Sequence, residues 1–459
     1  MKRIYVDINE TPPLHRWVAL SLQHLFAMFG ATVLVPIITG LDVQAALLSS
    51  GLGTLLFLVL TKGMIPNYLG SSFAFIGPII SVSASEGPGA AMLGALLAGI
   101  VYVIVASIVA KIGVGWLNRL LPPMVIGSII IVIGLSVAGV AVGWALNDPL
   151  AAADGPQYSL HAVEIAFVAM LVTVIANIYF RGFLSVIPIL TGMIAGYVYT
   201  LIRYPEWIDF QSIASAPWIV TPSEMFSKHM LTTQLFEAFG SPSAWIAALI
   251  IVPVAFVTLA EHIGHLLVTG SVMERNLMEK PGLHRSLLGD GLATSLAAVI
   301  GGPPNTTYGE NIGVLAITRV YSRNVIALAA VFAILFAFIG KIGALLMTIP
   351  KPVLGGVSIV LFGIIAAQGV RMYVENKIDF AEKRNMVISA IILVTGIGGF
   401  KLEFHNIHIE NIVANLTIDN IAMATFLGII LHAILPNKET AFGTAAKNEK
   451  LPNDTEKVS

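Results

Sequence analysis

Long apolar blocks separated by short polar stretches are the feature that most constrains this chain. The blocks have about the 17–25 residues that a membrane-spanning helix needs. Only 11% of the 459 residues are charged, whereas a soluble globular domain carries about 25%. The chain therefore cannot cover itself for water, and the sequence predicts an all-α polytopic membrane protein.

The apolar blocks predict fourteen membrane segments. Lysine and arginine gather on the cytoplasmic side of membrane proteins, and an N-terminus placed inside puts most of the 25 such residues there. Both termini are therefore expected in the cytoplasm. The predicted segments are 17–39, 43–61, 70–82, 89–110, 121–144, 160–180, 183–202, 243–268, 286–300, 304–318, 324–346, 352–370, 385–400 and 417–435.

The polar ends and the composition exclude several classes of protein. Residues 1–16 lack the apolar core and cleavage site of a signal peptide, so we expect the first span to stay in the mature protein. The polar tail 436–459 is typical of a disordered segment. The chain has no cysteine and a net charge of -1, which excludes disulfides and gives no support for a nucleic-acid partner.

The two halves of the chain are weakly similar to each other. Seven segments per half is an odd number, so the copies are expected to have opposite orientations in a 7+7 inverted repeat. Such repeats, with segments interrupted by Gly and Pro at matching positions, indicate a secondary transporter with its site at mid-membrane. The alternative is chance similarity between apolar stretches rich in Gly and Pro. The matching pairs are 110–132 with 340–362, 21–26 with 259–264, and 71–78 with 306–313.

Segments 3 and 10 are interrupted by residues that a spanning helix avoids. In "GGPPNTTYGENIG" (301–313), Pro303 and Pro304 prevent an ordinary helix start, so we expect a short extended piece and then a half-helix from about Glu310. "SSFAF" (71–75) is expected to mirror it as the extended piece of segment 3. Irregular backbone at membrane depth must face protein or a water-filled cavity. The half-helix start then offers N–H donors to a carbonyl or anionic ligand.

Glu310 would supply a hydrogen-bond acceptor at the same place. A charged residue at mid-membrane costs about 2.5–3.5 kcal/mol on insertion scales. The alternative role, a carboxylate that stabilises the half-helix start, contributes only about 0.3–1 kcal/mol. The larger cost favours a role in ligand binding.

Segment 8 carries a second polar group, Glu261 with His262 and His265. Glu261 and His265 are four residues apart and share a helix face. Burial disfavours a charged carboxylate and histidine titrates near neutral pH, so the pair can take up and release a proton. The alternative is a structural Glu–His pair, and no metal site is expected. Gln23 and His24 occupy the matching positions in segment 1. Either Gln23 contributes its amide to the site, or the two residues form a hydrogen-bonded pair that packs the helices.

Two weaker candidates lie outside these segments. Asp290 is near the inner end of segment 9, where we expect a structural pair with Arg285. "EFHNIHIE" (403–410) contains His405, His408 and Glu410 in a predicted outer loop. A solvated loop is the preferred interpretation there and a metal site the alternative. We predict no cofactor and no catalytic residue, because neither a Walker motif nor a hydrolytic constellation occurs.

At "ENIGVLAITR" (310–319) the sequence resembles the nucleobase–ascorbate transporter family, also called nucleobase:cation symporter-2. The family signature is matched by Glu310, Asn311, Gly313, Thr318 and Arg319. The first-span Gln-His pair and the eighth-span acid with a downstream His match as well. The Glu-first, Arg-last form, with "SSFAF" in segment 3, resembles the bacterial uracil permeases of the family rather than its purine members.

The resemblance implies a domain organisation. A core domain would comprise 17–112 (segments 1–4) and 243–346 (segments 8–11). A gate domain would comprise 121–202 (segments 5–7) and 352–435 (segments 12–14). Residues 1–16 and 436–459 would be cytoplasmic ends. The resemblance also implies proton symport, a homodimer and a bacterial cytoplasmic membrane.

The resemblance further implies roles for individual residues, by position match. Proton coupling would involve His265 with Glu261 and His24, and Gln23, Asn311 and Thr318 would support the site. The substrate contacts would be Glu261, Glu310, Phe73, Tyr308, Gly309 and Phe362.

The chemistry of uracil agrees with this set. Uracil is flat and neutral, with two N–H donors for carboxylates and two carbonyls for backbone N–H groups, and Phe73 and Tyr308 offer rings to its faces. The expected function is therefore proton-coupled uracil symport by alternating access, with uracil, the proton and membrane lipid as partners. The alternatives are a purine, xanthine or anion carrier on the same scaffold, and a channel.

Overall fold

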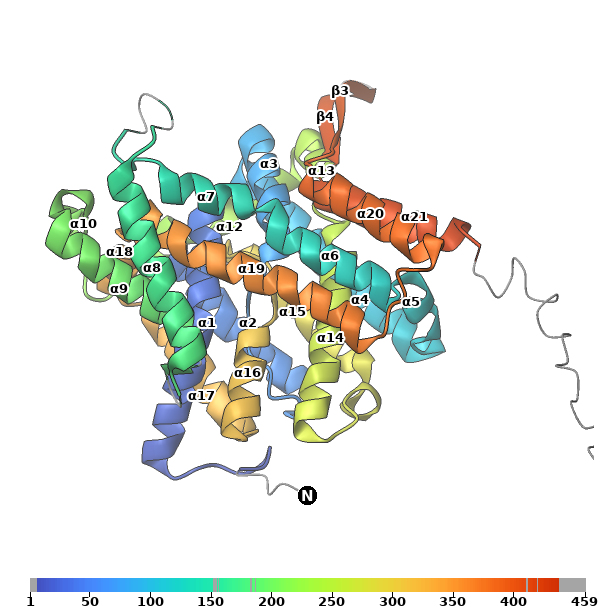
Figure 1. The fold of residues 1–459 in the computed structure, drawn as a ribbon, viewed down its shortest axis with the longest axis horizontal. Coiled ribbons are helices and arrows are strands. Elements are labelled where there is room, and N and C mark those ends of the chain that lie inside the picture. The colour runs from blue at the N-terminus through green and yellow to red at the C-terminus, as the bar shows by residue number, and fades with distance from the viewer. Residues whose placement is uncertain are drawn as a thin grey trace, which may run out of the picture.

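Long apolar helices dominate the structure (Figure 1). The computed structural model describes residues 6–151, 155, 157–181, 184–185, 187–409, 412–418 and 420–436. Within these residues, seven helices are long and apolar enough to span a membrane, or eight if one bent pair counts as a span. The predicted helical membrane fold is confirmed at this level. The seven are α1 (Leu14–Thr39), α2 (Val43–Leu60), α4 (Pro88–Ile112), α6 (Pro123–Ser136) with α7 (Ala138–Leu146), α8 (Leu160–Tyr179), α14 (Val254–Met273) and α19 (Lys351–Glu375).

Shorter elements complete the described chain. The bent pair is α17 (Arg323–Ala337) with α18 (Gly340–Met347). Other helices that fall on predicted segments are α3 (Ile76–Glu86), α9 (Pro188–Arg203), α15 (Leu283–Ile300), α16 (Gly309–Thr318), α20 (Lys383–Ile397) and α21 (Asn420–Ile434). α13 (Pro242–Ala248) falls on the start of the predicted segment 243–268. The connections contain α5 (Gly115–Leu120), η4 (Pro205–Trp207), α10 (Phe210–Ser215), α11 (Pro222–Glu224), η5 (Met225–His229), α12 (Thr232–Phe239) and η6 (Met278–Gly282).

Three predicted segments are wrong in detail. The predicted helix 243–268 is broken by turns over 249–253, because Pro253 cannot donate to a continuous helix. The predicted helix 324–346 bends by 81° between α17 and α18, where Ile339 is extended and Gly340 closely approaches the Pro217 carbonyl. Residues 403–409 of the predicted outer loop lie in β3 (Leu402–Ile409), which pairs antiparallel with β4 (Ile412–Ile418). Its runs of alternating apolar residues are typical of strands.

Two buried three-residue strands meet in the interrupted segments. β1 (Leu69–Ser71) pairs antiparallel with β2 (Asn305–Thr307), with Gly70 opposite Thr306. A Cβ at Gly70 would lie 2.7 Å from the Tyr308 ring, so only glycine fits there. The extended piece predicted for 71–75 ends early, because Phe73–Phe75 form the 3-10 turn η1. This turn leads into α3 and puts Pro78 in its first turn, where proline is tolerated.

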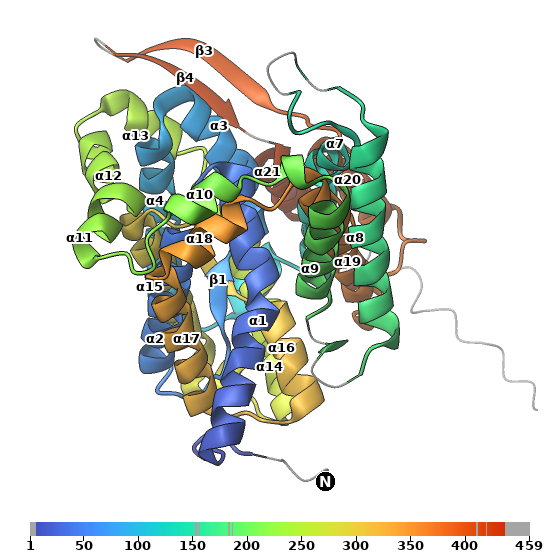
Figure 2. The same cartoon turned by 90° about the vertical axis from the view of Figure 1, so that its left-hand side faces the viewer.

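The helices form two groups, which lie side by side in Figure 2. In one group α15 packs on α2 and α4, and α17 packs on α1 and α2. In the other group α19 packs on α6, α7 and α8, and α20 packs on α6 and α21. The paired strands and the half-helix α16 belong to the first group, so the irregular backbone faces the second group across the middle of the protein.

Residues 6–13, here called the N-terminal strap, tie together the lower ends of the first group in Figure 1. Tyr321 N–H donates to Val6 C=O and Arg323 N–H donates to Ile8 C=O, both at 3.0 Å. Arg275, just beyond α14, donates to Asp7 at 2.7 Å. The strap therefore links the loop after α14 to the connection between α16 and α17.

Candidate functional site

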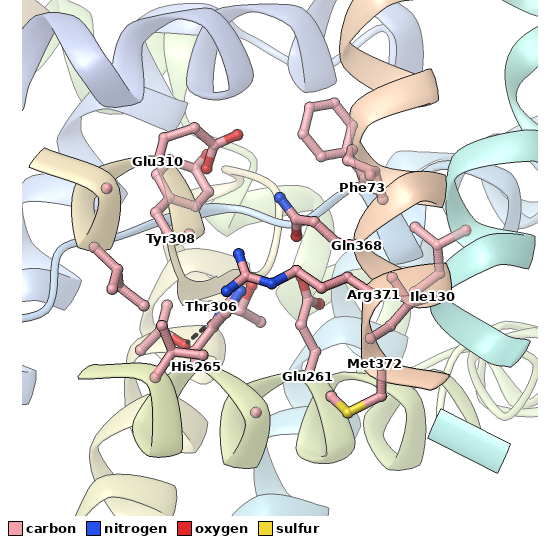
Figure 3. Close-up of a pocket in the computed structure, with 18 of the residues that line it drawn as sticks. Phe73, Ile130, Glu261, His265, Thr306, Tyr308, Glu310, Gln368, Arg371 and Met372 are labelled. Atoms are coloured by element: carbon pink, nitrogen blue, oxygen red, sulfur yellow. Dashed lines mark hydrogen bonds between the residues drawn. The ribbon is translucent and has the colours of Figure 1, made fainter. Parts of the chain in front are cut away.

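A cavity of about 350 Å³ lies between the two helix groups (Figure 3). Its size is within the range of small-molecule sites, about 300–1,000 Å³. β1, η1, β2, α14 and α16 line it on one side, and α6 and α19 line it on the other. The interrupted segments therefore border a hollow, as backbone that leaves its helix at membrane depth requires.

Acidic side chains and helix N–H donors share one wall of this cavity. Glu261 and His265 project from neighbouring turns of α14, and Glu310 lies in the first turn of α16. The first N–H groups of α16, from Gly309 onward, have no partner within the helix. Neither carboxylate bonds another side chain among the described residues. The wall thus presents carboxylate acceptors next to the N–H donors of the α16 start, one of which, that of Glu310, bonds its own carboxylate.

Tyr308 contributes its ring to the cavity and its hydroxyl to the frame. The hydroxyl donates to the Ser71 carbonyl at 2.9 Å and lies 3.0 Å from Thr32 Oγ1. It therefore ties the start of α16 to β1 and to α1. The ring, with that of Phe73, is left to form apolar surface along the cavity.

Thr307 connects the cavity to a buried polar group that the sequence did not single out as a unit. Its Oγ1 lies 3.2 Å from His265 Nδ1 and 3.3 Å from His262 Nδ1. His262 Nδ1 lies 3.4 Å from Asp290 Oδ2, and both side chains are fully buried. The expected pair of Asp290 with Arg285 is wrong, since Arg285 donates instead to the Leu60 carbonyl at 3.4 Å.

Five predicted site residues lie outside the cavity lining, and four of them belong to α1 and α16. Asn311 Nδ2 donates to the His24 carbonyl at 2.9 Å and lies 3.2 Å from His24 Nδ1, so these two residues join α16 to α1. Gln23 is buried beside His24 on α1. Thr318 donates to the Val314 carbonyl at 2.8 Å, within the last turn of α16. His24, Asn311 and Thr318 thus support α16, which carries cavity residues.

Phe73 and Phe362 meet where the two helix groups touch. Phe73 lines the cavity, whereas Phe362 on α19 lies behind it and is 1% exposed. Their ring centroids are 5.7 Å apart and the ring planes cross at 81°, an edge-to-face contact. This aromatic pair closes the cavity on the side of η1.

α19 contributes cavity residues that the sequence analysis missed. Gln368 and Arg371 line the cavity from α19 (Figure 3). Glu375 lines it as well, and Arg371 Nε donates to Glu375 at 2.6 Å. From its place just after the predicted segment 352–370, Arg371 would be expected only as one of the cytoplasmic cations. The spacing i, i+3, i+7 was a usable indication, because it puts all three polar residues on one face of an apolar helix.

The described residues contain no cluster of three or more His, Asp or Glu side chains that could hold a metal ion. The alternative metal site in 403–410 is not tested by this observation, because Glu410 lies outside the described residues. The predicted disordered tail, 436–459, also lies outside the described residues, except for Pro436.

Comparison with known proteins gives the family. Residues 15–403 match the permease family. The uracil permease of Bacillus caldolyticus is 50% identical over 96% of this chain and 97% of its own length. Those of Bacillus subtilis (strain 168) and Escherichia coli (strain K12) are 48% and 43% identical, each over 95% of this chain and 96% and 94% of their own lengths. These relatives are named as permeases, which are transport proteins rather than enzymes.

Two solved structures share the fold at low sequence identity. The transmembrane domain of the cyanobacterial bicarbonate transporter BicA has a TM-score of 0.54 at 14% identity, over 85% of this chain and all of that one. The murine Slc26a9 anion transporter in its inward-facing state has a TM-score of 0.61 at 11% identity, over 93% of this chain and 68% of that one. They support a membrane transporter fold and no more. The chain therefore belongs to the permease family, the nucleobase–ascorbate transporter family that the motif at 310–319 predicts.

Proposed function

We propose that this protein is a proton-coupled uracil symporter of a bacterial cytoplasmic membrane, working by alternating access. The observation that carries the proposal is the single cavity wall that combines Glu261, Glu310 and the N–H groups at the start of α16. The relatives named uracil permeases, 43–50% identical, support the choice of substrate.

The wall complements the edge of uracil. The two carboxylates accept from the two N–H groups of the base, and the N–H groups near Gly309 donate to its carbonyls. The hydrogen bond to the ionised Glu310 contributes about 1.5–3 kcal/mol, and a bond to the protonated Glu261, which accepts through its carbonyl oxygen, about 0.5–1.5 kcal/mol. The rings of Tyr308 and Phe73 cover the faces of the base. A site of this kind rejects analogues that leave its buried polar groups unpaired.

Proton coupling would use Glu261 and His265. With the cavity open to the outside, a proton neutralises Glu261 with the help of His265, uracil binds, and the loaded protein changes access. Loss of the proton to the cytoplasm then favours release. Thr307 holds the His265 ring, and His24 acts indirectly by holding Asn311 next to Glu310.

We assign the two helix groups to a core domain (17–112 and 243–346) and a gate domain (121–202 and 352–435). We infer fourteen crossings in two inverted halves. In support, each half contains a short helix, then a proline, then a longer helix, at α5–α6 and at α18–α19. The antiparallel pairing of β1 with β2 supports the inversion. A homodimer with both termini in the cytoplasm completes this proposal.

An anion carrier on the same scaffold fits the cavity less well. Three lining carboxylates, Glu261, Glu310 and Glu375, face one lining arginine. An anion brought close to these carboxylates would be repelled, whereas a neutral base with N–H donors would be bound.

Uptake of labelled uracil into proteoliposomes tests the proposal. We expect accumulation against a uracil gradient when the outside is more acidic, and collapse of that accumulation with a protonophore. Downhill flux without accumulation would indicate a channel. Uptake of labelled xanthine or sulfate, with no uptake of labelled uracil, would refute the substrate assignment.

Two variants test the assigned residues. Glu310→Ala is expected to weaken uracil binding at least about tenfold, from loss of one charged hydrogen bond, and unchanged affinity by calorimetry would remove Glu310 from the site. Glu261→Gln is expected to abolish the pH dependence of transport. Uptake that kept its full pH dependence would remove Glu261 from the coupling scheme.

A further inference from the structure

The polar face of α19 lies at an open end of the cavity. Arg371 and Glu375 belong to the last turns of α19, and both line the cavity. Their side chains are 73% and 51% exposed although they face this hollow. Solvent therefore enters between α19 and the ends of α14 and α16, where Val272 and Ala316 also line the cavity.

The opposite end of the same cavity is closed, and the same helix closes it. Phe362 on α19 contacts Phe73 edge to face. Nine residues separate Phe362 from Arg371, which is about 14 Å along a helix. α19 therefore carries an apolar contact at the closed end of the cavity and a charged pair at the open end. Alternating access requires that the closed end opens and the open end closes.

Closing the open end would remove water from Arg371 and Glu375. The side chains facing them across the opening include Val268 and Val272 on α14 and Ala316 on α16. None of these three can bond a charge. A single buried charge without a partner is strongly unfavourable, whereas two opposite charges in contact lose less on dehydration.

We propose that Arg371 and Glu375 form the gate at the open end of the cavity. The two charges neutralise each other on one face of α19, at 2.6 Å, so that this face can close against α14 and α16. The inference rests on the proposed alternating-access function. An exposed i, i+4 pair adds little to stability, so the gating role, unlike a stabilising one, predicts a large effect on transport when the pair is broken.

Variants that remove one charge or both charges of the pair test the gate. Arg371→Gln and Glu375→Gln each leave one unpaired charge, and each is expected to lower the rate of uracil uptake at least about tenfold, with uracil Kd within about threefold. The double variant Arg371→Gln/Glu375→Gln carries no charge to bury and is expected to recover most of the rate. Lys228→Gln is the matched control, because it breaks an exposed i, i+4 pair with Glu224 outside this cavity.

The absence of cysteine from the chain gives a direct readout of the opening. Ala316→Cys places the one thiol at the open end, where a water-soluble maleimide can reach it. Each single charge variant is expected to raise the fraction of protein labelled during turnover, and the double variant to return it to the parent level.

Three outcomes would overturn the gate. These are single variants that transport at the parent rate, a double variant as slow as the single ones, or labelling that does not follow the charges. A parent protein that fails to accumulate uracil would refute the proposed function instead. The comparison of labelling between the variants would then still decide whether the charged pair controls the opening.

Discussion

The hydroxyl of Tyr308 allows a sharp test of how the cavity wall is built. It donates to the Ser71 carbonyl at 2.9 Å and lies 3.0 Å from Thr32 Oγ1. The partners belong to β1 and α1, so the hydroxyl is already hydrogen-bonded within the protein although Tyr308 and Ser71 both line the cavity. Tyr308→Phe would keep the ring and remove both hydrogen bonds.

The expected effects on stability and on binding differ. A neutral buried hydrogen bond contributes about 0.5–1.5 kcal/mol, and a partner left unsatisfied costs about 1–3 kcal/mol. Tyr308→Phe should therefore lower the free energy of unfolding by about 1–3 kcal/mol. Because the hydroxyl is already engaged, uracil affinity should change by no more than about threefold, or about 0.7 kcal/mol.

Thermal unfolding in detergent and calorimetric titration with uracil measure the two quantities. Tyr373→Phe is a matched control, since its buried hydroxyl lies 2.7 Å from Ser128 Oγ and 2.9 Å from Ser389 Oγ in the other helix group. It should lose a similar amount of stability. Unchanged stability of Tyr308→Phe with a large loss of affinity would refute the reasoning, because the hydroxyl would then face the ligand.

Three further substitutions test other contacts. In Gly309→Ala the new Cβ would lie 3.2 Å from His265 Nε2; the crowding should weaken uracil binding about tenfold, and calorimetry showing parent affinity would contradict it. Thr307→Val removes the hydroxyl 3.2 Å from His265 Nδ1; it should shift the pH profile of uptake, while Thr307→Ser should not. Asp7→Asn removes the charge of the ion pair with Arg275, in which both side chains are more than a third exposed; thermal unfolding should show a loss of only about 0–1 kcal/mol, and a much larger loss would indicate that the strap is structurally essential.

The fold could be predicted where the cause is local. Two prolines before residue 305 and glycine at 309 mark the start of α16, which begins one residue from the predicted position. The break at 249–253 has a local cause in Pro253. It also coincides with a contact to another helix, which no local sequence pattern shows. Gly94 of α4 approaches the Ala248 carbonyl at a distance that only a missing Cβ allows. How closely α4 approaches Ala248 is set by tertiary packing and could not be predicted from the sequence.

The candidate site shows the same division. Glu261 and Glu310 stand out because a carboxyl group inside an apolar segment is costly and needs a reason. Arg371 and Glu375 do not stand out, because charged residues at the end of a segment usually lie at the membrane surface. Only the tilt of α19 across the protein brings them to the cavity (Figure 1).

The partner of Asp290 shows that sequence spacing can exclude an interaction partner but cannot identify the correct one. Arg285 was expected to pair with it because the two are close in sequence. Five residues on an α-helix are about 140° apart around the axis, so the two side chains point to different sides of α15. Spacing alone therefore argues against that pair. The choice of His262 on α14, 3.4 Å away, follows only from how the helices pack. A buried charge in a membrane bundle should thus first be compared with residues on neighbouring helices, because its own helix can offer partners only at spacings of three or four.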